Sequence, residues 1–249
     1  MSGRPLLTLD IGTRKVAGLV TVTGRKGLRI VAAEVMEHAT RAMLDGQIHD
    51  VAAVAEVVAR IVARLEKRTG ESLREVAVAA AGRALRTVRG RAQRQLSGLT
   101  QLSADDVFSL ELEAVQAAQT ALSEVLREGE RPQDYHYVGH SVTQSVLDGF
   151  PLTHLVGQRG SAAEIEVIAT FLPRGVVDSL QAVLEICNLE MVALTLEPIA
   201  ALSVAVPESM RHLNLALVDI GARTSDIALT ARGAVLAYDM VRIADDEIT

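Results

Sequence analysis

Two short stretches near opposite ends of the chain share one pattern, in which an apolar run ends at an aspartate and then turns on a glycine into a second apolar run. The first is Leu-Asp-Ile-Gly-Thr-Arg-Lys-Val at residues 9–16, and the second is Val-Asp-Ile-Gly-Ala-Arg-Thr-Ser-Asp at residues 218–226. Apolar runs joined by a glycine turn predict a β-hairpin. We expect Gly12 and Gly221 to adopt positive φ, so that the backbone N–H groups of each turn hold phosphate oxygens.

An aspartate stands at the end of the first strand of each predicted hairpin. Carboxylates bind Mg²⁺ largely through its coordinated waters. Asp10 and Asp219 are therefore predicted to hold a hydrated Mg²⁺ beside the phosphates. One such hairpin is weak evidence, whereas two with the same order of residues predict a phosphate site that is built from both.

Composition limits the class of protein. The chain has 249 residues, of which 49% are hydrophobic, so it is long enough for one or two buried α/β units. Aromatic residues are 2% of the chain and its net charge is −6. Nucleic-acid-binding modules need aromatic platforms or a basic surface, so nucleic acid is not expected as a partner.

The single Cys187 excludes an intrachain disulfide. No apolar run reaches the ~20 residues of a membrane span, and a signal peptide is not evident, so a cytoplasmic location is expected.

The first part of the chain reads as strands followed by a helix. Three strand-like runs predict an antiparallel meander, at residues 6–9, 15–22 and 28–37. Asp50 is predicted to cap a helix whose apolar residues repeat at helical spacing as far as Leu65 and which ends at Gly70. A further strand is expected at residues 75–81.

From Leu85 the pattern changes. An arginine-rich strand is predicted to present one solvated face, made by Arg86, Arg89, Arg91 and Arg94. A capping box at Ser103 opens a helix, and strands are expected at residues 135–146 and 164–172. The remaining elements are a helix at 176–186, a strand at 191–196, a helix from Glu197, and strands at 213–218 and 235–241.

The paired hairpins resemble those of the actin-like ATPase superfamily, where a "phosphate 1" and a "phosphate 2" hairpin face each other across a nucleotide cleft. Within it the chain is similar to the bacterial cell-division family FtsA, whose first motif, Asp-Ile-Gly-Thr-x-Lys-Val, is intact at residues 10–16. The second motif, usually Asp-Ile-Gly-Gly-Gly-Thr-Thr-Asp-Ile, is partly kept, with Ala222 and Arg223 in place of two glycines. Ala244 and Asp245 stand where the family usually has Gly-Gly.

The resemblance implies an α/β fold. The expected architecture is an actin-like (ribonuclease H-like) domain with an inserted small α+β subdomain, of the SHS2 type, and a second actin-like domain that is incomplete. The first domain would comprise residues 1–84 and 173–198, the inserted subdomain residues 85–172, and the start of the second domain residues 199–249. The resemblance covers nearly the whole chain, but the chain covers only the first half to two thirds of a full family member.

The resemblance also implies the cofactors, ATP and Mg²⁺, and the residues that hold them. Asp10 and Asp219 would be the metal-binding residues. The nucleotide phosphates would be held by Gly12, Thr13, Arg14, Lys15, Gly221, Ala222, Arg223 and Thr224. Glu197, together with Asp10, would be catalytic, because Glu197 matches the position of a carboxylate near the attacking water in some superfamily members.

Several of these assignments have a second interpretation. Asp10 and Asp219 are also explained as caps of their turns, and Lys15 as a solvated lysine at a strand edge. Glu197 precedes a proline and is equally explained as the cap of the following helix. At Ala222 and Arg223, a β-carbon either crowds the γ-phosphate or leaves room for the guanidinium of Arg223 to bind it. An ATPase activity is expected to be weak at most, and hydrolysis is left open.

The FtsA resemblance implies a function in bacterial cell division. ATP would act as an assembly switch, the chain would form actin-like protofilaments, and the inserted subdomain would recruit other division proteins. The family is peripheral on the inner face of the cytoplasmic membrane, through a C-terminal segment that is absent here. Alternatives are a pilus-assembly actin homologue, a small-molecule kinase of the same superfamily, and a nucleotide-independent scaffold. Because the second domain is incomplete, we expect exposed apolar surface, weak nucleotide affinity and self-association.

Overall fold

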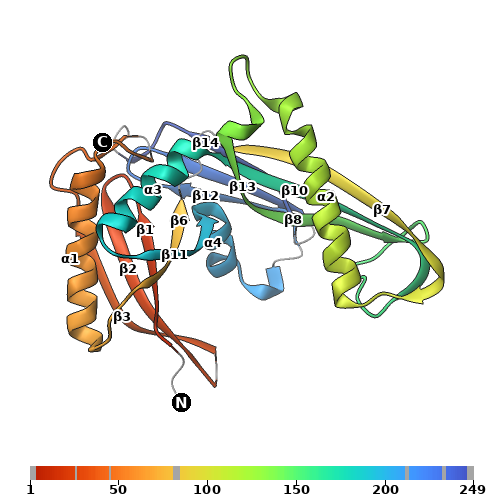
Figure 1. Cartoon of the computed structure of the whole chain (residues 1–249), viewed down its shortest axis with the longest axis horizontal. Helices are drawn as coiled ribbons and strands as arrows, with labels where there is room; N and C mark the ends of the chain where they lie inside the picture. Colours follow the sequence, from red (N-terminus) through yellow and green to blue (C-terminus); the bar gives the residue numbers. More distant parts are fainter. Residues whose placement is uncertain are drawn as a thin grey trace.

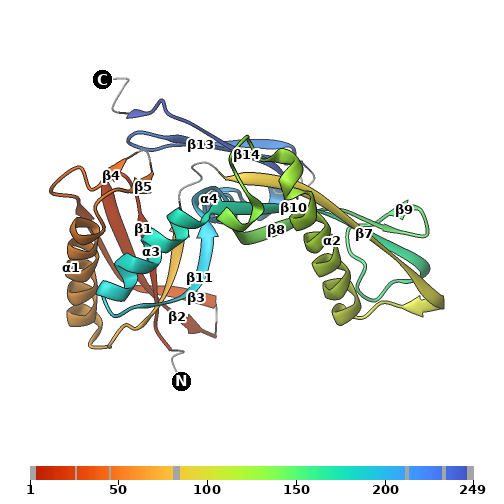
Figure 2. The same cartoon turned by 45° about the horizontal axis from the view of Figure 1, so that its top comes forward.

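The computed structural model describes residues 4–25, 27–44, 46–80, 85–210, 213–231 and 234–245. Its strands form three main sheets and one short hairpin. Figures 1 and 2 show the first sheet with α1 and α3 at one end of the molecule and a second sheet with α2 at the other end. The third sheet, drawn in dark blue, lies alongside both.

The first sheet has five strands in the order β11-β6-β1-β2-β3. These strands are β1 (Leu6–Ile11), β2 (Lys15–Gly24), β3 (Gly27–Glu37), β6 (Glu75–Ala80) and β11 (Glu190–Leu196). The pairs β1–β2 and β2–β3 are antiparallel, which confirms the predicted meander. Strand β6 runs parallel to β1, and β11 runs parallel to β6. The short pair β4 (Met43–Leu44) and β5 (Gln47–Ile48) leads into the first helix.

Helices α1 (Val51–Thr69) and α3 (Arg174–Ile186) cover one face of this sheet and bury its apolar core. The side chain of Asp50 accepts a hydrogen bond from the N–H of Ala53, and Gly70 adopts the left-handed conformation with φ 73°, so both predicted ends of α1 are confirmed. A β-carbon at Gly18 would lie 2.7 Å from a side-chain carbon of Ile61, so a glycine in β2 is what lets α1 lie this close to the sheet.

The second sheet has the order β7-β10-β8-β9 and is antiparallel in every pair. Its strands are β7 (Arg86–Gln101), β8 (Tyr135–Leu147), β9 (Phe150–Pro151) and β10 (Arg159–Pro173), with the 3₁₀ turn η1 (Pro132–Asp134) before β8. Helix α2 (Ala104–Val125) packs on one face, and its capping box between Ser103 and Asp106 is present as predicted. A β-carbon at Gly90 would lie 2.0 Å from the carbonyl oxygen of Ala114, so β7 and α2 are in backbone contact.

The prediction of one solvated arginine face on β7 is wrong. Arg89 and Arg91 form ion pairs with Glu166 and Glu164 of the neighbouring strand β10. Arg94 instead reaches Glu113 and Ser109 of α2, on the opposite face. Alternate residues of a strand point to opposite faces, and these arginines occupy odd and even positions, so the cluster is divided between two faces.

The third sheet comprises β12 (Leu215–Ile220), β13 (Ser225–Ala231) and β14 (Ala234–Val241), all antiparallel. Helix α4 (Glu197–Ala205) leads to it from the first sheet, followed by the 3₁₀ turn η2 (Glu208–Met210). A small cluster around Tyr238 and Ala228 packs against Ile199 and Leu202 of α4.

Several apolar side chains of the third sheet are exposed, as expected, including Val218, Ile220 and Leu229. They share one face, because Val218 pairs with Ile227 and the neighbouring pairs keep the same alternation.

Among the described residues, no helix has both the length and the apolar character that a membrane span requires.

We predict that Gly90→Ala lowers the free energy of unfolding by about 3 kcal/mol, because the added β-carbon collides with the backbone of α2. Gly139→Ala, on β8 of the same sheet, is the matched control, since nothing lies within 4 Å of a β-carbon there, and its effect should stay below about 0.5 kcal/mol. Urea denaturation of the two variants measures the difference. Equal stabilities would contradict the close packing of β7 against α2.

Candidate functional site

The two predicted hairpins are present and are built in the same way. In the β1–β2 hairpin the last strand pair is Ile11 with Val16, and the N–H of Gly12 donates to the carbonyl of Lys15 at 3.0 Å. In the β12–β13 hairpin the last strand pair is Ile220 with Ser225. The N–H of Gly221 donates a hydrogen bond to the carbonyl of Thr224 at 2.9 Å. Each turn therefore has two residues at its tip, and an arginine is the second of them in both.

Glycine is required in these turns for a reason other than the one predicted. Neither Gly12 nor Gly221 has a positive φ, so that expectation is wrong. A β-carbon at Gly12 would lie 3.2 Å from the carbonyl oxygen of Lys15, and one at Gly221 would lie 3.0 Å from that of Thr224. These separations are tighter than nearly all real Cβ contacts. The glycines thus allow the chain to fold back closely on itself.

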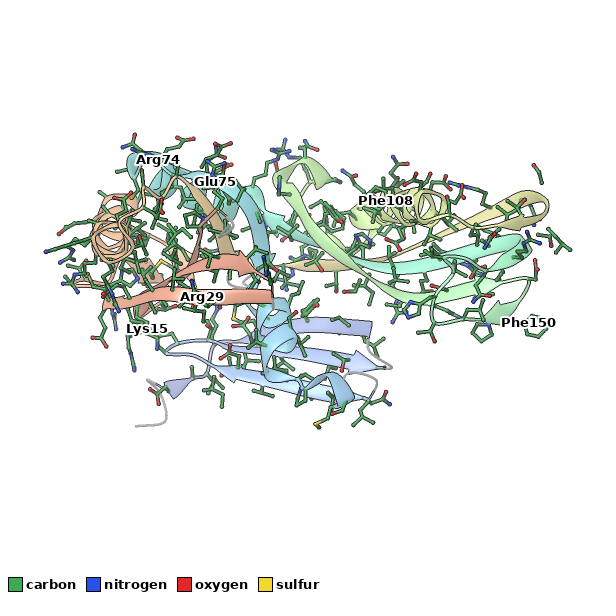
Figure 3. The ribbon with its side chains drawn as sticks, turned by 90° about the horizontal axis from the view of Figure 1, so that it is seen from below. Lys15, Arg29, Arg74, Glu75, Phe108 and Phe150 are labelled. Carbon is green, nitrogen blue, oxygen red and sulfur yellow. The ribbon has the colours of Figure 1, made fainter. Side chains whose placement is uncertain are left out.

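A cavity of about 540 Å³ lies between the two turns. Its walls contain nearly all the predicted site residues, namely Asp10, Gly12, Thr13, Arg14, Lys15, Glu197, Asp219, Gly221, Ala222 and Thr224. Arg223 is not among the described lining residues. Lys15, the first residue of β2, lies on the side of the first sheet that faces the third sheet (Figure 3). A larger hollow of about 950 Å³ beside β8 gathers none of the predicted residues.

Two aspartates of the third sheet stand directly opposite each other. Asp219 of β12 pairs with Asp226 of β13, so both carboxyl groups leave the sheet on the same face and line the cavity. Asp226 is buried, with 6% of its surface exposed. Like charges directly opposite each other in a sheet repel, and a cation beside them would reduce this repulsion.

Glu197 adds a buried carboxyl group to the same place. It is the first residue of α4, Leu196 is the N-cap, and no side chain caps the helix, so the interpretation of Glu197 as a cap is wrong. Its Oε1 atom is buried without a hydrogen-bond partner in the described parts of the chain. Burial raises its pKa well above the ordinary glutamate value, and three aspartates add to the rise, Asp10, Asp226 and Asp219.

Asp10 lies across the cavity from the third sheet. Partial loss of hydration raises its pKa, the charge of Asp219 raises it further, and Lys15 acts in the opposite direction. The first strand of each hairpin therefore brings its carboxylate close enough to the other to interact. Within the described ranges no three Asp, Glu, His or Cys residues are close enough to ligate an ion directly.

Residues from neighbouring loops hold the first turn. The Nε2 of His38 is 3.0 Å from the carbonyl oxygen of Gly12, and the N–H of His38 donates to the carbonyl of Arg14. Because a carbonyl only accepts, Nε2 carries the proton. The hydroxyl of Thr13 accepts the N–H of Gly46, from the turn between β4 and β5. These three contacts use acceptor groups of the turn, so they fix its shape without engaging its N–H donors.

Sequence reasoning missed five residues of this site: Glu37, His38, Gly46, Asp226 and Asp245. Asp226 had a usable signal, because a two-residue turn places it directly opposite Asp219. Glu37 had one as well, since it pairs with Lys15 in the predicted meander. No sequence signal identifies His38 and Gly46, because their positions depend on loops that return from elsewhere in the chain. Asp245 stands out as a departure from the family motif, but that departure does not predict its contact with Arg14.

Comparison with known proteins gives one consistent result. No protein-family profile matches the chain. The cell-division protein FtsA of Pseudomonas aeruginosa is 25% identical over 251 residues, which covers 100% of this chain and 56% of the relative. FtsA of Escherichia coli is 25% identical over 243 residues, or 97% of this chain and 54% of the relative. The chain resembles the N-terminal part of FtsA. It spans about half the length of these curated relatives.

Solved structures agree on the fold. The PilM–PilN type IV pilus biogenesis complex matches with a TM-score of 0.66 at 16% identity, over 96% of this chain and 62% of the matched chain. The ethanolamine utilization protein EutJ of Carboxydothermus hydrogenoformans matches with a TM-score of 0.50 at 15% identity, over 98% and 53%. The fold is actin-like. The resemblance to FtsA and this fold agree with the two facing hairpins.

We predict that Glu197→Gln is more stable than the unmodified chain at neutral pH. A carboxyl group whose pKa is raised on folding stabilises the fold fully only below its unfolded pKa, near 4.3, and loses this contribution as the pH rises through the folded value. The advantage of Gln should therefore be small near pH 4 and grow with pH, by about 1.4 kcal/mol for each pH unit that separates the unfolded pKa from the folded one.

Urea midpoints measured without divalent cations between pH 4 and 8 test this prediction. Glu37→Gln, which changes an exposed carboxylate of the same cavity, is the control and should show no such trend. A stability difference for Glu197→Gln that does not change with pH would show that Glu197 is charged in the folded state.

Proposed function

We propose that this chain binds ATP with Mg²⁺ between its two hairpins, and that the nucleotide serves as an assembly switch in bacterial cell division, as the resemblance to FtsA suggests. The observation that supports this most is the pair of equivalent glycine turns on either side of a cavity whose walls carry several carboxyl groups, among them Asp10, Glu197, Asp219 and Asp226. Turn N–H groups favour phosphate oxygens, and convergent carboxylates favour a divalent cation.

The first turn would hold the β-phosphate. Thr13 would contribute its hydroxyl, Arg14 and Lys15 their charges, and the turn its N–H groups. The second turn would face the γ-phosphate through Gly221, Ala222 and Thr224. Arg223, which is not among the lining residues, would have to reorient to contact a phosphate. The Cβ of Ala222 would narrow the space on this side, which agrees with weak affinity.

The carboxyl groups fit a hydrated Mg²⁺. Glu197 has a buried oxygen without a partner in the described parts of the chain, and Asp219 and Asp226 place two further carboxyl groups side by side on the wall of the cavity. Among the described residues no three such groups are close enough to ligate an ion directly, so Asp10 and Asp219 would hold it through its waters. A bound Mg²⁺ would supply the positive charge that allows phosphates to enter this acidic cavity.

Hydrolysis would be slow. Glu197 would orient a water toward the γ-phosphate, and it can accept a proton only in its charged form. Burial and three aspartates raise the pKa of Glu197 and favour its neutral form, so the group is poorly prepared to act as a base. A slow ATPase suits a switch, in which the nucleotide shifts the population between open and closed forms.

We propose that residues 1–84 with 173–198 form one actin-like domain and that residues 199–249 begin a second one. Residues 85–172 would form an inserted subdomain that binds other division proteins, and copies of the protein would assemble into protofilaments in the cytoplasm. The separate sheet and core of the β7–β10 region support an independent unit.

A pilus-assembly protein is the second candidate. The match to the PilM–PilN complex, with a TM-score of 0.66, supports it. The relatives with detectable sequence identity favour the first candidate, because the curated matches over nearly the whole chain are FtsA.

Titration calorimetry with ATP and Mg²⁺ tests the proposed site. Asp10→Asn should weaken binding at least tenfold, which corresponds to about 1.4 kcal/mol, because it removes a charge that holds the cation. Glu124→Gln, an exposed acidic position on α2, is the control for the loss of one negative charge and should bind like the unmodified chain. Chelation of Mg²⁺ should have the same effect as Asp10→Asn. Binding that survives both changes would contradict the proposed cation site.

A further inference from the structure

Arg14 and Asp245 form an ion pair that joins the two sides of the cavity. Nη1 of Arg14, at the tip of the first turn, donates to Oδ2 of Asp245 at 3.3 Å. The backbone N–H of Asp245 donates to the carbonyl of Gly221 at 3.2 Å, so this residue is attached to the second turn. Both side chains line the cavity. The pair therefore spans the space in which the phosphates would bind.

The position of this pair makes it a competitor for an anion. Arg14 and Lys15 are the cationic side chains among the described lining residues, where carboxyl groups outnumber them. A guanidinium binds carboxylates and phosphates with the same forked set of donors. While Asp245 holds Arg14, one of the two cations that would attract a phosphate is engaged by a carboxylate.

The pair is also easily exchanged. Its side chains are 47% and 60% exposed, and exposed ion pairs add little to stability. The second turn keeps its own Gly221 to Thr224 bond and its strand pairing without this contact. The bridge is therefore not needed to hold the fold, and an anion with more charge than a carboxylate can displace it.

We propose that Asp245 is an internal competitor for the phosphate site, which binds Arg14 when no ligand is bound and lowers the affinity for anionic ligands. This inference rests on the proposed function, because it describes the regulation of the same site. Entry of a phosphate transfers the guanidinium of Arg14 from Asp245 to the phosphate. Asp245 is thus a determinant of affinity in this chain.

Titration calorimetry with ADP and Mg²⁺, and separately with inorganic pyrophosphate, tests the proposal. Asp245→Asn keeps the shape of the side chain and removes its charge, and it should bind both ligands about tenfold more tightly. Asp239→Asn, an exposed position on β14, is the matched control and should leave both affinities unchanged. In an Arg14→Gln background, Asp245→Asn should change affinity less than about twofold.

The outcomes separate this inference from the proposed function. Tighter pyrophosphate binding by Asp245→Asn, with no binding of ADP by any variant, would retain the competition and reject the nucleotide function. The competition is overturned if Asp245→Asn binds pyrophosphate no better than the unmodified chain, or if no variant binds it. An equal gain in the Arg14→Gln background would show general repulsion instead of competition for the guanidinium.

Discussion

Burial of carboxyl groups, together with the repulsion among them, sets the electrostatics of the cavity. Asp219 and Asp226 leave adjacent strands on the same face, Asp10 approaches from the first sheet, and Glu197 enters from the start of α4. Burial raises the pKa of Asp10 and of Glu197, and the aspartates beside them raise it further. The fold keeps these groups together, so a cation in the cavity would be favoured.

The fold supports this repulsion because each acidic residue sits on a rigid element. Strand β1 is the central strand of the first sheet, and its apolar residues Leu7 and Leu9 are fully buried beneath α1 and α3. The turns contain close backbone contacts at which a β-carbon would be crowded, and His38 secures the first turn through the carbonyls of Gly12 and Arg14. The turn N–H groups and the carboxylates are thus held in position, which would lower the ordering cost of binding a ligand there.

Sequence and structure agree where local rules decide and differ where distant segments meet. The hairpins, the ends of α1 and the capping box of α2 follow from glycine, Asp50 and Ser103, whose effects reach only a few residues. The odd and even positions of the β7 arginines already place them on two faces, but their partners on β10 and α2 follow from no local pattern. The bridge from Arg14 to Asp245 joins residues 231 positions apart, and no local pattern predicts it.

The two hairpins also show how a correct prediction can have a different cause. Gly12 and Gly221 were expected to supply positive φ, yet they allow a close approach to the carbonyls of Lys15 and Thr224. The hairpins were predicted from the repeated order of residues. That prediction holds whether the turn needs a glycine for positive φ or for a close backbone approach.

The central claim is that both hairpins contribute to a single site for a cation and phosphates. Amide NMR of the chain with ATP and Mn²⁺ in place of Mg²⁺ tests it most directly, because the paramagnetic ion broadens signals only close to itself. We expect the signals of residues 12–15 and 221–224 to broaden together, while those of α2 remain sharp. Broadening in one hairpin alone, or in the β7–β10 sheet, would contradict the claim.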